Sequence, residues 1–85
     1  MDLVIERDAM KVLRKLQPKL RASLVQRLKV IAADPFAEHA NVTALAGAKD
    51  AYRLRRGDWR VLYRIDREAE AMHVEAIETR GGVYR

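Results

Sequence analysis

Apolar residues recur with two different periods along this chain, and the change of period separates a helical first half from a stranded second half. Between residues 9 and 31 they stand three or four positions apart, which is the spacing of one helix face. The residues on this face are Ala9, Leu13, Leu16, Leu20, Leu24, Leu28 and Ile31. From residue 52 onward apolar and polar residues alternate, as they do along half-buried strands. The pattern therefore predicts helices followed by a sheet.

Two helices and one short strand are predicted in the first half. Residues 3–6 form the strand, and Asp8 is the predicted N-cap of the first helix, because its side chain can accept a hydrogen bond from the first turn. Pro18 ends that helix and suits the first turn of a second one, which residues 33–35 end. The two helices together predict an αα-hairpin.

A β-hairpin centred on Gly57 and Asp58 is the clearest element of the second half. Glycine at the first position of a two-residue turn permits the positive φ that a type II′ turn requires. The resulting register pairs Tyr52 with Tyr63, Leu54 with Val61, and Arg55 with Arg60. The tyrosines, Leu54 and Val61 then share one apolar face, which belongs in the core.

A further strand, residues 71–79, is predicted after a turn at residues 66–70. Unbroken alternation would place Met72, Val74 and Ala76 in the core, and His73, Glu75 and Ile77 on the opposite face. The element order is then β-α-α-β-β-β. This order predicts an α+β fold in which the helical hairpin packs on an antiparallel sheet, with a short C-terminal tail.

Arginines gather on the hairpin face that points away from the predicted core. Arg53, Arg55 and Arg60 lie on this face, with Arg64 further along. Like charges directly opposite each other destabilise a strand pair, so we expect these side chains to act on an anion. Phosphate is the favoured candidate, because arginine binds it through two parallel hydrogen bonds. A solvated charged face without a ligand is the alternative.

Composition narrows the classes of function. The length of 85 residues predicts one domain, residues 1–85, and the net charge of +5 favours a polyanionic partner. There is no cysteine, which excludes disulfides and cysteine metal sites and agrees with a cytoplasmic location. The N-terminus does not have the pattern of a signal peptide, and no apolar run approaches membrane-spanning length. No phosphate-binding glycine loop or metal cluster is present in the sequence, so no cofactor is expected.

The hairpin and the tail together resemble the RelE/ParE superfamily of toxin–antitoxin toxins, with the RelE branch favoured. The resemblance covers essentially the whole chain and is carried by residues 45–47, 52–66 and 80–85. It implies a RelE-like RNase fold and an endoribonuclease that enters the ribosomal A site and cuts the mRNA there. In that reaction the 2′-hydroxyl attacks the adjacent phosphate. The resemblance also implies the site residues Arg53, Arg55, Arg60, Arg80 and Tyr84, the last of which stacks on a base.

One departure from the RelE pattern leaves the general base unassigned. RelE members commonly carry lysines at the two positions held here by Arg53 and Arg55. A guanidinium stays protonated at pH 7 and cannot take the 2′-hydroxyl proton. The candidates in the sequence are His73, Glu75, His39 and Glu38, and positioning without any side-chain base is a further alternative.

The resemblance also implies a protein partner and a competing function. The partner is a cognate antitoxin with an acidic, partly disordered segment that covers the arginines, in a heterotetramer or larger complex. Ribosome and mRNA are the targets in the RelE interpretation. The alternative is a ParE-like inhibitor of DNA gyrase with no RNase activity. A basic nucleic-acid-binding domain without toxicity is a third hypothesis.

Overall fold

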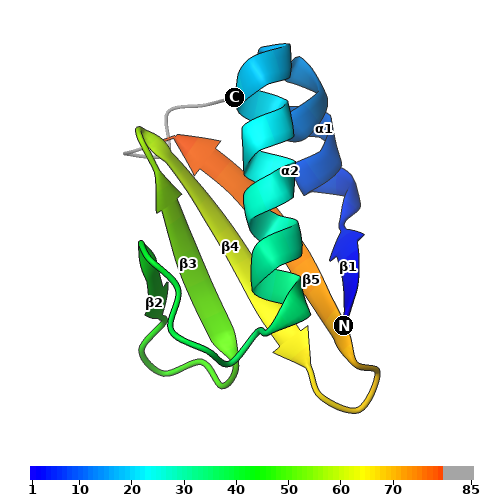
Figure 1. Ribbon diagram of the computed structural model, residues 1–85, viewed down its shortest axis with the longest axis vertical. Helices are drawn as coiled ribbons and strands as arrows, with labels where there is room; N and C mark the ends of the chain where they lie inside the picture. The colour runs from blue at the N-terminus through cyan, green and yellow to red at the C-terminus, as the bar shows by residue number, and fades with distance from the viewer. Residues whose placement is uncertain (80–85) are drawn as a thin grey trace.

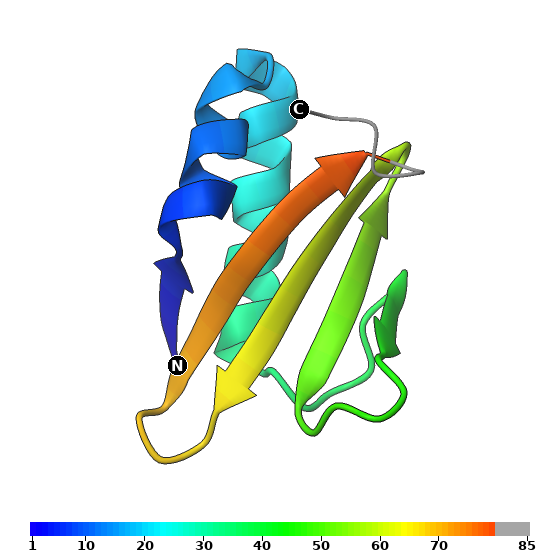
Figure 2. The same cartoon turned by 180° about the vertical axis from the view of Figure 1, so that it is seen from behind.

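Two helices lie on one face of a five-stranded sheet in the computed structural model, which describes residues 1–79 (Figure 1). The elements are β1 (Asp2–Ile5), α1 (Arg7–Lys15), α2 (Pro18–Ala33), β2 (Val42–Ala44), β3 (Ala51–Arg56), β4 (Trp59–Asp66) and β5 (Ala71–Thr79). The α+β class and the helical hairpin are confirmed. Seen from behind, β5 crosses in front of α2, α1 stands to one side, and neither helix covers β3, β4 or β5, so the described helices leave this face of the sheet open (Figure 2).

The sheet differs from the prediction in two ways. Its strand order is β1-β5-β4-β3-β2, and β1 pairs with β5 in parallel while the other pairs are antiparallel. The sheet is therefore mixed rather than purely antiparallel. Strand β2 was not predicted, because three residues are too few for an alternating pattern to stand out. Its pairing with β3 forms only in the folded chain.

A single apolar layer between helices and sheet forms the core. Its members are Ala9, Leu13, Leu16, Leu24, Leu28, Ile31, Ala32, Leu54, Val61, Tyr63, Ile65, Met72, Val74 and Ile77. Leu20 of the predicted helical stripe is only partly buried and packs against this layer. Burial raises the pKa of Tyr63 to about 12, so its phenol stays protonated at neutral pH.

The first helix begins two residues earlier than predicted. Glu6 is its N-cap, and Asp8 lies inside the first turn. The reason is that Glu6 still belongs to the strand pairing: its amide donates to the carbonyl of Val74 at 2.9 Å, and its own carbonyl accepts from Met10 at 2.8 Å. The carboxylate of Asp8 remains favourable there, near the positive end of the helix dipole. Pro18 is the first residue of α2, as predicted.

A β-bulge in the β4–β5 pair reverses the predicted facing of the last part of β5. Tyr63 pairs with Val74, but Leu62 pairs with Ala76, so Glu75 is the extra residue. Beyond the bulge Ile77 is only 4% exposed, while Ala76 leaves the core. The predicted placement of Ala76 inside and Ile77 outside was therefore wrong. The bulge allows the larger apolar side chain to pack in the core.

Three connections at one end of the sheet are tied together by Arg67. Its guanidinium donates two hydrogen bonds to the carboxylate of Asp50, at 2.7 and 2.9 Å, and lies 4.2 Å from the ring centroid of Phe36. These residues belong to the β4–β5 turn, the β2–β3 connection and the α2–β2 connection respectively. The hydrogen bonds from Arg67 hold the pKa of Asp50 below its ordinary value.

We expect Arg67→Ala to lower the melting temperature at pH 7, and the difference from wild type to shrink on acidification. A carboxyl group whose pKa is lower in the folded state than in the unfolded state, where it is about 4, stabilises the folded state at pH values above the unfolded-state pKa. This stabilisation is lost as the pH falls through the folded-state pKa. Melting curves between neutral and acidic pH measure the effect. Arg21→Ala is the control, because within residues 1–79 Arg21 donates to the main-chain carbonyl of Arg14 and forms no ion pair with a carboxylate. A difference independent of pH would contradict the assignment to Asp50.

Candidate functional site

The β3–β4 hairpin has the predicted turn and register. Gly57 has a φ of +57°, whereas Asp58 is not in the positive-φ region, which is the pattern of a II′ turn. The register pairs Tyr52 with Tyr63, Leu54 with Val61, and Arg55 with Arg60. The rings of the two tyrosines stack, with centroids 5.4 Å apart. This packing on the core side holds both strands in place under the arginines.

The strand arginines line a hollow on the open face of the sheet. We call it the arginine hollow: a depression of about 280 Å³ lined by Arg53, Arg55, Gly57, Asp58 and Arg60. Arg55 is exposed, whereas Arg53 and Arg60 are half-buried. The structure therefore brings together all three of the predicted site residues that lie within residues 1–79.

Arg60 has an unsatisfied donor within the part of the chain that the structure describes. Its Nε is buried and has no hydrogen-bond partner there. Leaving a buried donor without a partner costs about 1–3 kcal/mol, and more for charged groups. No described carboxylate lies within 4 Å of the guanidinium groups of Arg53, Arg55 or Arg60 in an ion pair. An anion in the hollow would supply both the acceptor and the charge.

None of the four candidate bases lines the arginine hollow. His73 stands opposite Arg64, four positions along β4 from Arg60, and its Nδ1 lies 3.3 Å from a carboxylate oxygen of Glu6. Glu75 accepts a hydrogen bond from Arg64 at 3.3 Å. Both side chains are therefore engaged elsewhere on the sheet.

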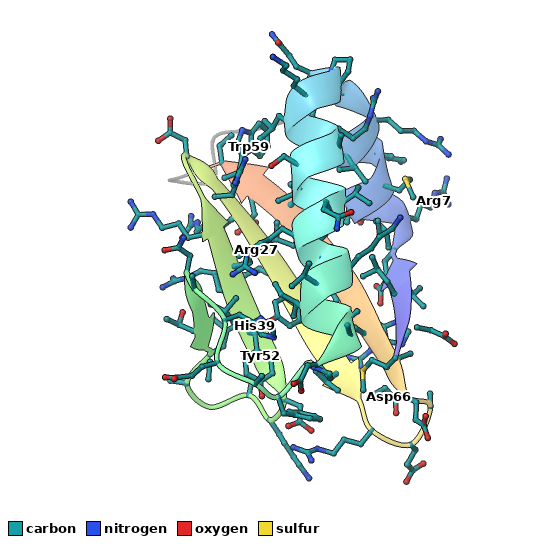
Figure 3. The ribbon with its side chains drawn as sticks, in the orientation of Figure 1. Arg7, Arg27, His39, Tyr52, Trp59 and Asp66 are labelled. Carbon is teal, nitrogen blue, oxygen red and sulfur yellow. The ribbon has the colours of Figure 1, made fainter. Side chains whose placement is uncertain are left out.

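The other two candidates, Glu38 and His39, lie on the helix side of the sheet. They line a second hollow, of about 410 Å³, together with Tyr52. Figure 3 shows His39 beside Tyr52, between α2 and the β2–β3 edge. The Nε2 of His39 lies 2.7 Å from the carbonyl oxygen of Asp34. The sheet separates this hollow from the arginines.

The structure places an unpredicted carboxylate beside the arginines. Glu78 pairs with Arg60 across β4 and β5, and it is half-buried. In the sequence-based prediction, unbroken alternation along residues 71–79 placed Ile77 on the open face with the arginines, and therefore Glu78 on the core side. Because the bulge shifts the register by one residue, Glu78 moves to the arginine face. No signal in the sequence reveals the bulge.

The two tail residues of the predicted site, Arg80 and Tyr84, lie outside the described residues. Trp59, at the start of β4, is half-buried and packs against the core. Within residues 1–79, no group of three or more histidine, aspartate or glutamate side chains could hold a metal ion. No described helix is both long and apolar enough to cross a membrane.

The sequence matches a family model over residues 3–84, described as the ParE toxin of the type II toxin–antitoxin system parDE. No curated protein matches the chain. The fold is similar to that of the isolated E. coli RelE toxin, with a TM-score of 0.80 and 26% identity over 93% of this chain and 83% of that one. It is also similar to the toxin in the intact E. coli RelBE complex, with a TM-score of 0.76 and 27% identity over 94% and 95%. The archaeal RelE–RelB complex from Pyrococcus horikoshii OT3 shares the fold, with a TM-score of 0.80 and 23% identity over 94% of both chains.

Proposed function

Because this chain belongs to the ParE toxin family of type II toxin–antitoxin systems, and so to the RelE/ParE superfamily, we propose that it is a RelE-like, ribosome-dependent mRNA endonuclease. It cuts mRNA in the ribosomal A site and thereby inhibits translation. The observation that supports this most directly is the arginine hollow, which contains a buried guanidinium N–H that has no partner among residues 1–79. Its size and charge suit a phosphodiester of an extended RNA strand.

The chemistry of RNA cleavage fits what arginines can do. The 2′-oxygen attacks the neighbouring phosphorus, and negative charge accumulates on the non-bridging oxygens before the bond to the 5′-oxygen breaks. Arg53, Arg55 and Arg60 line one hollow and present several N–H groups to these oxygens. Fixed donors aimed at developing charge contribute about 10²–10³-fold each to a rate.

In this proposal Arg80 and Tyr84 complete the site from the tail, the arginine on the phosphate and the tyrosine by stacking on a base. Strand β5 ends at Thr79, opposite Trp59 at the hairpin end of β4. Residue 80 therefore follows directly in the chain after β5, the strand that pairs with β4 and its Arg60. A stacked base is worth about 1–3 kcal/mol, so Tyr84 would serve mainly to position the mRNA.

A cognate antitoxin is the partner in this proposal. Two similar solved structures are complexes of a RelE toxin with its RelB antitoxin. The net charge of +5 and the open arginine face suit an acidic segment that orders on binding. We place toxin and antitoxin in the cytoplasm, where ribosomes work.

Inhibition of DNA gyrase without RNA cleavage is the second candidate. Two observations favour it. The family model that matches is that of ParE toxins. The two β3 positions where RelE toxins commonly carry lysine hold Arg53 and Arg55, and arginine cannot act as a base. In that case the arginine hollow would be a docking surface rather than a reaction site.

Primer extension on a reporter mRNA in a reconstituted translation system distinguishes these functions. Wild-type protein is expected to produce discrete cuts at A-site codons, and an Arg60→Ala/Tyr84→Ala variant is expected to leave the mRNA intact. The cuts must also disappear when ribosomes are omitted. Intact mRNA with folded wild-type protein would contradict the endonuclease proposal. A gyrase supercoiling assay on the same preparation would then test the alternative.

A further inference from the structure

A row of three charged residues crosses the open face of the sheet at the hairpin end. Arg55 pairs with Arg60 across β3 and β4, and Arg60 pairs with Glu78 across β4 and β5. Directly opposite residues on one sheet face have Cβ atoms about 4.5–5.5 Å apart. The bulge at Leu62/Tyr63 brings Glu78 to this face. The row therefore puts a carboxylate next to Arg60, whose buried Nε has no partner in the described part of the chain.

Glu78 forms no ion pair within residues 1–79, although it stands opposite Arg60. On the same strand Glu75 binds Arg64, and on the adjoining β1–α1 junction Glu6 binds His73. Both of these carboxylates already have a side-chain partner on the sheet, Arg64 for Glu75 and His73 for Glu6. Glu78 is also half-buried, whereas Glu75 is exposed. Among the glutamates of the open face, Glu78 is the one placed to act on a substrate held by Arg60.

A carboxylate supplies the proton acceptor that the arginines lack. Transesterification needs an acceptor for the 2′-hydroxyl proton, and glutamate is one of the side chains that serve as general bases. Three guanidinium groups hold the phosphate but cannot accept a proton. With Arg60 to hold the phosphate on β4 and Glu78 to accept the proton on the neighbouring β5, both roles are present on one sheet.

We propose that Glu78 is the general base of this site, which takes the proton of the attacking 2′-hydroxyl while Arg60 holds the adjacent phosphate. The inference rests on the endonuclease function proposed above. The 2′-oxygen forms a bond to phosphorus as its proton moves to Glu78, and the bond from phosphorus to the 5′-oxygen breaks. Water protonates the 5′-oxygen, and the resulting hydroxide takes the proton back from Glu78. The products are a 2′,3′-cyclic phosphate and a 5′-hydroxyl, with no net change in protons.

The test is single-turnover cleavage of ribosome-bound mRNA by Glu78→Gln, measured beside wild type and two other variants. Glu78→Gln keeps the size of the side chain and is expected to cut about 10²–10⁴-fold more slowly. Glu75→Gln makes the same change on the same strand, away from the arginine hollow, and is expected to cut at the wild-type rate. Asp58→Asn tests the other carboxylate of the hollow, which lines it directly, and its loss of rate is expected to be smaller than that of Glu78→Gln.

A binding measurement distinguishes catalysis from positioning. An mRNA with a 2′-deoxy nucleotide at the cut site is not cleaved, so its affinity for toxin on the ribosome can be measured directly. Glu78→Gln is expected to bind it at least as tightly as wild type, because a negative charge beside the phosphate is removed. An equal loss of binding and of rate would overturn the proposal in favour of a structural role.

Two further outcomes would overturn the proposal. If Glu78→Gln cuts at the wild-type rate, Glu78 is excluded as the base. If Asp58→Asn loses cleavage while Glu78→Gln keeps it, the base is Asp58. Failure of wild type and Glu75→Gln to cut any mRNA would reject the endonuclease function and the base together. That result differs from a failure of the base alone, in which wild type still cuts.

Discussion

Replacement of Arg60 by alanine is expected to abolish growth inhibition and to lower the rate of mRNA cleavage by about 100- to 1,000-fold. Arg60 stands between Arg55 and Glu78, and its buried Nε has no partner among the described residues. Among the arginines of the hollow, it is therefore the one with a buried N–H, unpaired among residues 1–79, that a phosphate oxygen can accept. Removing it also relieves the repulsion from Arg55, so the fold should be retained.

Growth assays, single-turnover cleavage and circular dichroism of the purified variant measure these effects. Arg56→Ala is the matched control: it removes the same charge from the same hairpin, but Arg56 points to the helix side and donates to the Ser23 hydroxyl. The control is expected to remain toxic. An Arg60→Ala protein that is unfolded, or an Arg56→Ala protein that is equally inactive, would contradict the special role of Arg60.

Replacement of Ile77 by alanine is expected to lower the free energy of unfolding by about 2–5 kcal/mol. The side chain of Ile77 is 4% exposed and belongs to the core layer, because the bulge turns it inward. Truncating it removes buried methyl groups and leaves a cavity. Such a loss is a large fraction of the stability of a small domain.

Urea denaturation of Ile77→Ala and of Ala76→Ser measures this prediction. Ala76 lies opposite Leu62 on the open face and is half-buried, so its substitution is expected to cost less than about 1 kcal/mol. Without the bulge the order of the two effects would be reversed, since Ala76 would then face the core. The pair of variants therefore tests the register of β5 in solution.

The arginine hollow could be predicted because the residues that form it are close in the sequence. Gly57 and Asp58 determine the turn, the turn determines the pairing of Arg55 with Arg60, and the alternating apolar residues determine which face is buried. The two helices were predictable for the same reason. Their buried stripes depend on spacings of three and four residues, and Pro18 separates them.

The features that could not be predicted all depend on residues far apart in the sequence. The parallel pairing of β1 with β5 joins segments about 70 residues apart, and Arg67 binds Asp50 across two strands. The bulge depends on how well Ile77 fills the core once the helices have packed, which no local pattern expresses.

The sequence by itself thus determined the element types, the β3–β4 hairpin and the three arginines on its open face, because each depends on neighbours within one hairpin or one helix. The tertiary structure decided that Glu78 stands opposite Arg60 on the same face. Packing of Ile77 into the core fixes the register of β5, and a shift of one residue moves every later side chain to the other face. Glu78 reaches Arg60 for that reason, while the candidates that the sequence offered lie elsewhere.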